Sequence, residues 1–214
     1  MAGFIPPIGL APGSQYQLMF VTADKMTVTS SNVADYNAFV TTEAALNTSL
    51  PNVTWHAIVS TGSINARNNA PSNNLPTYNT LGQLVATAAA GLYPEATLQT
   101  APSIDQFGNG SSLFLAATGS DTQGVASFGG LGNASEITVY GIEQDVSNWL
   151  SSNFEKFPST STFQIYALSS PVTFVPEPSS LVLGILAGLT LLAFGVRRHK
   201  VGERGLLGQG SPVS

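Results

Sequence analysis

One stretch near the C-terminus constrains this 214-residue chain more than any other feature. From Leu181 to Val196 the sixteen residues LVLGILAGLTLLAFGV carry no charge, and only Thr190 has a polar side chain. As a helix the run would be about 24 Å long, or about 27 Å with the two serines before it, close to the ~30 Å of a bilayer's hydrocarbon core. It is apolar on every helical face, which does not suit a helix at the edge of a soluble core. The sequence therefore predicts a transmembrane helix over residues 181–196.

Charges on the two sides of this run differ in sign. Arg197, Arg198 and Lys200 follow it directly, and basic residues next to a span are held on the cytoplasmic side of a membrane. Residues 1–175 instead carry three basic and ten acidic side chains, a formal charge of −7. We expect residues 14–174 to form an extracytoplasmic domain and residues 199–214 to form a cytoplasmic basic tail.

A proline-rich tetrapeptide, Val175-Pro176-Glu177-Pro178, precedes the apolar run. Its two prolines lack backbone donors and favour an extended segment that an enzyme can reach. The tetrapeptide, the helix and the basic cluster of Arg197, Arg198 and Lys200 together closely resemble the PEP-CTERM sorting signal of bacterial envelope proteins, here over residues 175–198. The resemblance implies that a membrane-embedded exosortase recognises Pro176-Glu177-Pro178, cuts nearby, and releases or transfers the body to the cell surface or the exopolysaccharide matrix.

The first residues do not look like a signal peptide. Neither Lys nor Arg occurs before Lys25, and Pro6-Pro7 interrupt a short apolar stretch. We expect residues 1–13 to be a disordered or remnant N-terminus. Because the sorting signal serves only an exported chain, we expect the natural start to lie upstream of Met1; the alternative is a tail-anchored protein whose body faces the cytoplasm.

The body is predicted to be a single α+β domain. Tyr16–Thr22 is apolar on both faces, which predicts a buried central strand, and Phe163–Leu168 predicts a final strand. Because both strands are strongly apolar, we expect them to pair in one sheet around a loop-rich middle. The other expected elements are a helix over 33–47 that begins after Asn32, a strand over 53–60, a loop over 65–76, a helix or an extended segment over 80–92, short extended pieces joined by glycine turns over 102–133, and a short helix over 147–154.

A second resemblance concerns this body. The order of Phe20-Val21-Thr22, an alanine-containing helix, Leu50–Ser60 with Asn65-Ala66-Arg67, Leu84-Val85-Ala86 and Thr118-Gly119-Ser120 is similar to that of bacterial extracellular domains with the C-type-lectin or endostatin-like fold. This resemblance implies a lectin-like domain. The Glu-Pro-Asn and Trp-Asn-Asp triplets that bind calcium and sugar in true lectins are absent, so it implies no calcium site.

Catalytic signatures are missing from the sequence. The chain has no cysteine, and its seven Lys and Arg are too few to neutralise a row of phosphates, which argues against nucleic acid as a partner. His56, the one histidine of the body, is expected to be structural, and no Gly-x-Ser-x-Gly turn presents a nucleophile. We predict neither a cofactor nor a metal. The acids that could pair as in a glycosidase are Asp105, Asp121, Glu143 and Asp145.

Two functions remain open. The preferred one is a non-enzymatic envelope or extracellular-matrix protein, anchored in the membrane by its C-terminal helix and sorted by exosortase to the cell surface or matrix. Its body would bind exopolysaccharide through the loops Asn65–Asn74 and Ser103–Asn133, because irregular loops on a rigid sheet commonly carry recognition. The alternative is an envelope glycoside hydrolase that uses a carboxylate pair.

Overall fold

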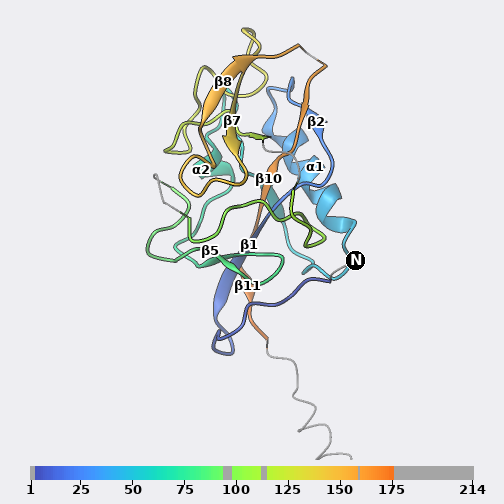
Figure 1. Cartoon of the computed structure of the whole chain (residues 1–214), viewed down its shortest axis with the longest axis vertical. Helices are drawn as coiled ribbons and strands as arrows, with labels where there is room; N and C mark the ends of the chain where they lie inside the picture. The colour runs from blue at the N-terminus through green and yellow to red at the C-terminus, as the bar shows by residue number, and fades with distance from the viewer. Residues whose placement is uncertain (1–2, 94–97, 112–114, 159, 176–214) are drawn as a thin grey trace, which may run out of the picture. The chain divides into compact units, whose positions relative to one another are not determined.

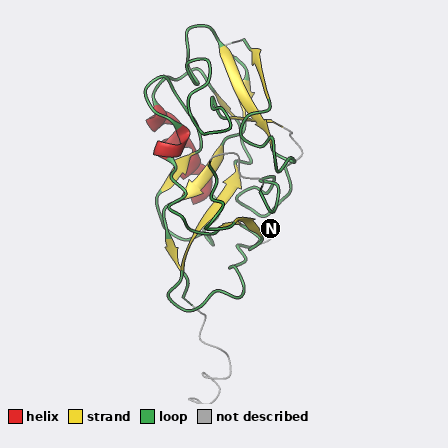
Figure 2. Cartoon of the chain, turned by 90° about the vertical axis from the view of Figure 1, so that its left-hand side faces the viewer, coloured by secondary structure: helices red, strands yellow, loops and turns green. Residues whose placement is uncertain are grey.

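A computed structural model describes residues 3–93, 98–111, 115–158 and 160–175. Over these ranges the chain is a mixed α+β domain made mostly of strands, with two short helices. Figure 2 shows how much of the domain consists of loops between short strands. The chain divides into two compact units, residues 1–174 and 175–214.

The main sheet is built around β1 (Gln15–Val21). Its strand order is β3-β10-β1-β4-β5, and β11 also pairs with β1. The bounds are Trp55–Ala57 for β3, Thr77–Asn79 for β4, Leu84–Ala86 for β5, Tyr166–Ser169 for β10 and Val172–Thr173 for β11. β1 runs antiparallel to β10, with Met19 opposite Leu168, and parallel to β4. Figure 1 shows the late, orange part of the domain running beside the blue β1. The predicted pairing of the first and last strands is confirmed.

Both faces of β1 are covered. Leu18 and Phe20 belong to one apolar cluster, whereas Met19 and Val21 belong to a second cluster on the opposite face. Successive side chains of a strand point to opposite faces, so a strand buried on both sides shows a continuous apolar run rather than an alternation. This double burial explains the pattern that predicted a central strand.

Helix α1 (Val33–Ala45) covers the face of the sheet that carries Phe20. As predicted, it begins after Asn32, whose side-chain oxygen accepts a hydrogen bond of 3.1 Å from the Ala34 N–H. Tyr36 and Val40 are buried in the same cluster as Phe20.

Two asparagines close the edge of the main sheet at β3. The Ala57 N–H donates to Asn37 Oδ1 at 2.8 Å, and the Ala57 carbonyl accepts from Asn69 Nδ2 at 2.8 Å. The two side-chain amides also bind each other at 2.8 and 3.0 Å. They satisfy the backbone groups that a further strand would pair, which protects an otherwise open edge.

Asn69 ends the short helix α2 (Ala66–Asn69), which lies in the segment predicted as loop only. That prediction was wrong because tertiary contacts decide the conformation here. Ala66 and Ala70 are buried in the second apolar cluster, and the Arg67 N–H donates to the Gly124 carbonyl at 3.2 Å.

A second sheet has the order β6-β7-β8, and a separate pair joins β2 to β9. The bounds are Met26–Thr27 for β2, Leu115–Ala117 for β6, Ile137–Ile142 for β7, Asn153–Lys156 for β8 and Thr162–Phe163 for β9. β8 is an edge strand whose four residues are all exposed.

The helix predicted over 147–154 is absent. The Asp145 carboxylate accepts from the N–H groups of Ser147 and Asn148 and bends the chain into a turn, and β8 starts at Asn153. This turn folds back onto β7 at Gly141, where a Cβ would lie 1.5 Å from the Trp149 carbonyl oxygen. The hydrogen bonds to Asp145 and the close approach of the Trp149 backbone to Gly141 therefore favour a turn where a helix was expected.

Other predicted elements differ mainly in extent. The strand over 53–60 is reduced to β3, the ambiguous segment 80–92 contains the strand β5, and the final strand is divided into β9 and β10. Residues 3–13, expected to be a disordered or remnant N-terminus, lie along the domain, where the Ile5 N–H donates to the Thr80 carbonyl and Phe4 packs against the first apolar cluster.

Among the described residues no helix has both the length and the apolar character needed to cross a membrane. The predicted transmembrane helix over 181–196 and the predicted cytoplasmic tail over 199–214 lie outside these residues.

The asparagine pair at the sheet edge gives a first prediction. Asn37→Ala leaves the buried Ala57 N–H without its acceptor, so the free energy of unfolding should fall by about 2 kcal/mol. Urea unfolding of a chain ending at residue 175 measures this loss. Asn68→Ala, a neighbouring exposed asparagine, is the matched control and should change stability by less than about 0.5 kcal/mol. Equal stabilities of the two variants would show that the edge does not depend on the pair.

Candidate functional site

Most of the predicted sorting residues lie outside the described chain. Val175 is described and is 77% exposed. Pro176, Glu177 and Pro178 of the sorting motif, with Arg197, Arg198 and Lys200 of the basic cluster, fall in the range 176–214, of which the structure gives no description.

Three of the four candidate carboxylates organise turns. Asp105, Asp121 and Asp145 each accept hydrogen bonds from backbone N–H groups two to four residues further along the chain. Asp145 also accepts from the Asn148 side-chain amide at 2.8 Å, and this bond, followed by the backbone bonds, holds the pKa of the carboxyl below its ordinary value. Side chains used in this way shape loops.

Glu143 is the exception among these acids. Its side chain is fully buried. Burial raises its pKa to about 7, although a hydrogen bond with the Ser111 side chain and the charge of Lys25 lower it in part. The Tyr166 hydroxyl is buried without a hydrogen-bond partner in the described chain, and its pKa is raised by burial and by the charge of Glu143.

The burial of Glu143 limits what it can do chemically. A glycosidase acid must reach the glycosidic oxygen of its substrate, but no part of Glu143 is open to solvent. At neutral pH a carboxyl with a pKa of about 7 is half protonated, which lowers the cost of burying it. The arrangement suits a structural acid.

A buried polar network fixes the loops around the sheet. Gln106 donates to the Glu43 carboxylate at 2.8 Å and accepts from the Ala23 N–H at 2.9 Å. Gln164 donates to the Thr22 carbonyl and accepts from the Ser111 hydroxyl. These side chains tie the loop after β1 to segments far away in the sequence, and isolated Gln residues gave no sequence signal of that role.

His56 lies in β3 beside a cavity of about 180 Å³. Burial lowers the pKa of its imidazole, so the ring is neutral at pH 7. No carboxylate is among the described lining residues, which include Gln17 and Ser169.

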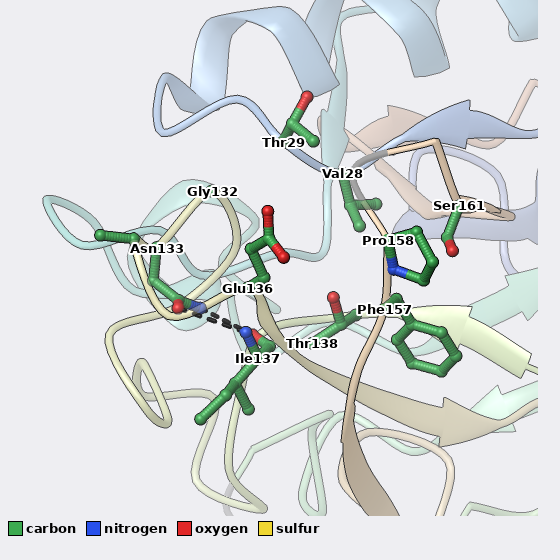
Figure 3. Close-up of a pocket in the computed structure, with 11 residues that line it drawn as sticks. Val28, Thr29, Gly132, Asn133, Glu136, Ile137, Thr138, Phe157, Pro158 and Ser161 are labelled. Atoms are coloured by element: carbon green, nitrogen blue, oxygen red, sulfur yellow. Dashed lines mark hydrogen bonds between the residues drawn. The ribbon is translucent and has the colours of Figure 1, made fainter.

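A surface groove of about 270 Å³ lies where β7 begins (Figure 3). Three segments that are distant in the sequence form it. Its described lining consists of Val28, Thr29, Gly132, Asn133, Ala134, Glu136, Ile137, Thr138, Phe157, Pro158 and Ser161.

Gly132 allows two of these segments to meet. Its φ is +70°, and a Cβ at this position would lie 2.2 Å from the Ser30 carbonyl oxygen. Its N–H donates to the Val28 carbonyl at 3.1 Å. A residue with a side chain would both strain the backbone and collide with Ser30, so glycine is required for this wall of the groove.

Asn133 then turns the chain into β7. Its side-chain amide donates to the Gly130 and Ile137 carbonyls at 2.7 and 2.6 Å. The turn leaves Glu136 exposed with a φ of +55°, a conformation uncommon for a residue with a side chain.

The opposite wall is apolar. The ring of Phe157 packs edge-on against Phe163, with 4.8 Å between ring centroids, and Pro158 continues the wall. Figure 3 shows the Glu136 carboxylate and the Thr138 hydroxyl directed into the space between the Gly132 loop and this wall. An apolar surface with a few convergent polar groups is the usual composition of a small-ligand site.

The two loops predicted to bind polymer differ in their relation to this groove. In the segment Asn65–Asn74, Asn65 accepts from the Ala126 N–H and Asn69 caps β3, so both amides serve the fold. Of the described residues of Ser103–Asn133, Gly132 and Asn133 line the groove. Sequence reasoning missed Glu136 and Phe157, because nothing in the local pattern connects them.

Comparison with known proteins does not place the chain in a family. No protein-family model matches its sequence, and no curated protein matches it either. The groove and the C-terminal sequence are therefore the basis for any functional proposal. Within the described chain, no three His, Cys, Asp or Glu side chains are grouped so that they could hold a metal ion.

Glu143 gives a second prediction, on pH dependence. Its folded pKa of about 7 lies above the ordinary 4.5, so stability should decrease as the pH rises from about 4.5 to 7 and then level off. Glu143→Gln removes this titration. The free energy of unfolding of the variant minus that of the parent should increase by about 3 kcal/mol from pH 4.5 to pH 8, measured by urea unfolding at both values. Glu155→Gln, at an exposed carboxylate of β8, should keep the parent's pH profile. If Glu143→Gln also kept it, Glu143 would not be the titrating group.

Proposed function

We propose that this chain is an exported envelope or extracellular-matrix protein with a non-enzymatic body that binds exopolysaccharide. The C-terminal sequence supports export and sorting to the envelope. It contains the tetrapeptide 175–178, the apolar run 181–196 and the basic cluster 197–200, in the order of a PEP-CTERM signal. Exosortase is the proposed processing partner. The protein would first be membrane-anchored with its domain extracytoplasmic, and after processing it would reach the cell surface or matrix.

The groove at the start of β7 is the observation that carries the binding proposal. A sugar ring has apolar faces and a rim of hydroxyl groups, so it needs an apolar wall beside hydrogen-bonding groups. Phe157 and Pro158 offer the wall, and Glu136, Thr138 and Ser161 offer the polar groups. A carboxylate that accepts from a hydroxyl forms one of the stronger hydrogen bonds in water.

The size and charge of the site favour a particular kind of polymer. At about 270 Å³ the groove lies just below the usual range of small-molecule pockets, so it suits one ring of a longer chain. Residues 1–175 have a formal charge of −7, from three basic and ten acidic side chains. Their field repels polyanions at low salt, which favours a neutral polysaccharide.

We also propose that the body is lectin-like and binds without calcium. The α+β arrangement, with paired terminal strands and long connecting loops, is compatible with the resemblance to extracellular lectin-like domains. The true lectins' calcium-binding triplets are absent from the sequence, and the groove has a single carboxylate, that of Glu136, in its described lining.

The alternative is an envelope glycoside hydrolase. The raised pKa of Glu143 is the observation in its favour, because a general acid needs such a value. The burial of Glu143 and the turn-forming roles of Asp105, Asp121 and Asp145 count against it. Release of reducing sugar from polysaccharides that the chain binds, abolished by Glu143→Gln, would favour the hydrolase.

The sorting signal gives a third prediction. Replacing Pro176 and Pro178 by Ala, or Arg197 and Arg198 by Glu, should leave full-length protein in the membrane of a bacterium that has an exosortase. The first change removes the proposed recognition motif, and the second removes the charges that orient the helix. An immunoblot of membrane and secreted fractions measures the processed share. Pro171→Ala, an exposed proline of the domain, should be processed normally, and normal processing of all three variants would refute the signal.

The groove gives a fourth prediction. Glu136→Gln keeps the size of the side chain but removes its charge, so retention of the chain on exopolysaccharide from an exosortase-bearing bacterium should weaken about tenfold. Affinity gel electrophoresis over a range of polymer concentrations measures retention. Asp24→Asn removes the same charge at an exposed site that does not line the groove and should bind like the parent. Equal weakening in both variants would point to overall charge instead of the groove.

A further inference from the structure

Two phenylalanine rings form an exposed contact near the groove. The centroids of Phe128 and Phe154 lie 4.5 Å apart, with 40° between the ring planes. Phe128 is 51% exposed and Phe154 is 58% exposed. Single exposed apolar side chains are common, but here two aromatic rings pack on each other and both stay open to water. We name this pair the aromatic platform.

The backbone at Phe128 is strained. Its φ of +51° places a bulky side chain in the left-handed region, which such residues rarely adopt. Hydrogen bonds on both sides hold this conformation: the Ser127 N–H donates to the Gly119 carbonyl and the Gly130 N–H donates to the Ser127 carbonyl, each at 2.9 Å. Because the ring stays half exposed, its burial does not account for the strain, and strained residues cluster at functional sites.

The platform and the groove share one loop but lie on opposite faces of the second sheet. In the β7–β8 register, Val139 is opposite Phe154 and Thr138 is opposite Glu155. Because successive side chains of a strand point to opposite faces, Phe154 lies on the other face from Thr138, which lines the groove. The loop that carries Phe128 continues directly into Gly132 and Asn133 of the groove wall, so a polymer that contacts both sites would pass around the sheet at this loop.

We infer that the aromatic platform is a second subsite for the polymer, which stacks on the apolar face of a sugar ring. This inference rests on the proposed function and names its substrate class: a neutral glucan with β-linked pyranose rings. Aromatic faces carry partial negative charge, and they attract the polarised axial C–H groups of a sugar. In β-glucopyranose every hydroxyl is equatorial, so both ring faces present only C–H groups. Such a ring lies flat on an aromatic face.

Self-association through this surface is less consistent with the structure. The edge strand β8 carries Glu155 and Lys156 next to Phe154, and charged side chains on an edge oppose strand pairing between copies. Two half-exposed rings also cover much less than the ~800 Å² per partner of a stable protein interface. A single polysaccharide chain is narrow, so the contact area of two aromatic rings is enough to bind one of its sugar rings.

The test uses the full chain in a polyoxyethylene detergent, whose head group carries no sugar to compete. Soluble hydroxyethylcellulose, a β-linked glucan, is the probe, and α-linked dextran is the comparison polymer. Phe154→Ala and Phe128→Asn should each weaken retention on hydroxyethylcellulose at least fivefold in affinity electrophoresis, and the parent should bind dextran more weakly. Leu46→Ala, which shortens a 55% exposed apolar side chain on the end of α1, should bind like the parent.

Phe128→Asn also separates binding from folding. Asparagine tolerates the left-handed region better than phenylalanine, so the thermal midpoint of this variant should be equal to or above the parent's while its retention falls. A fall in both would assign Phe128 to stability and overturn the inference.

The remaining outcomes distinguish the platform from the groove. If both platform variants bind like the parent while Glu136→Gln loses binding, the platform is overturned and the groove stands. If the parent binds neither this probe nor bacterial exopolysaccharide, the platform and the proposed function both fail. If the variants change sedimentation from dimer to monomer without changing retention, the platform is a protein interface and the inference is overturned.

Discussion

The antiparallel pairing of β1 with β10 is the interaction on which the rest of the domain depends. It pairs Met19 with Leu168. The chain that connects these two strands is almost the whole domain, and it must fold back to bring β10 beside β1. Both strands are buried on both faces, and each face needs a covering layer. Helix α1 supplies one, and the loops and short helix between β3 and the end of the second sheet supply the other. The size of the apolar surface on β1 thus determines how much of the chain must wrap around it.

Covering a sheet with loops buries many backbone polar groups, and side chains satisfy them. Asn37 and Asn69 complete the edge of β3, and Gln106 and Gln164 bind the loop after β1. Glu143 is a buried acid of the domain, and its raised pKa reduces the cost of its burial. Amide side chains therefore provide much of the buried hydrogen bonding that holds the loops to the main sheet.

Local patterns predicted the parts of this fold that local sequence determines. The continuous apolar run of β1, the Asn32 cap of α1 and the strong final strand were visible in the sequence. The helix α2 was missed because its contact with the distant Gly124 cannot be read from the local pattern. A helix over 147–154 was wrongly expected because the Asp145 side chain binds the N–H groups of Ser147 and Asn148 in a turn. The groove could not be foreseen because its walls come from distant segments. Gly132 permits the close approach to Ser30, and the β7–β8 pairing places Phe157 beside Glu136.

We propose that the body recognises a polymer at the groove, with the aromatic platform as a second contact. Amide chemical-shift mapping of an isotope-labelled chain ending at residue 175, titrated with exopolysaccharide fragments, tests this proposal. We expect shifts concentrated at residues 28–29, 128–139 and 154–161, with little change around Glu143 or His56. Shifts centred on Glu143, or no shifts at any polymer concentration, would contradict it.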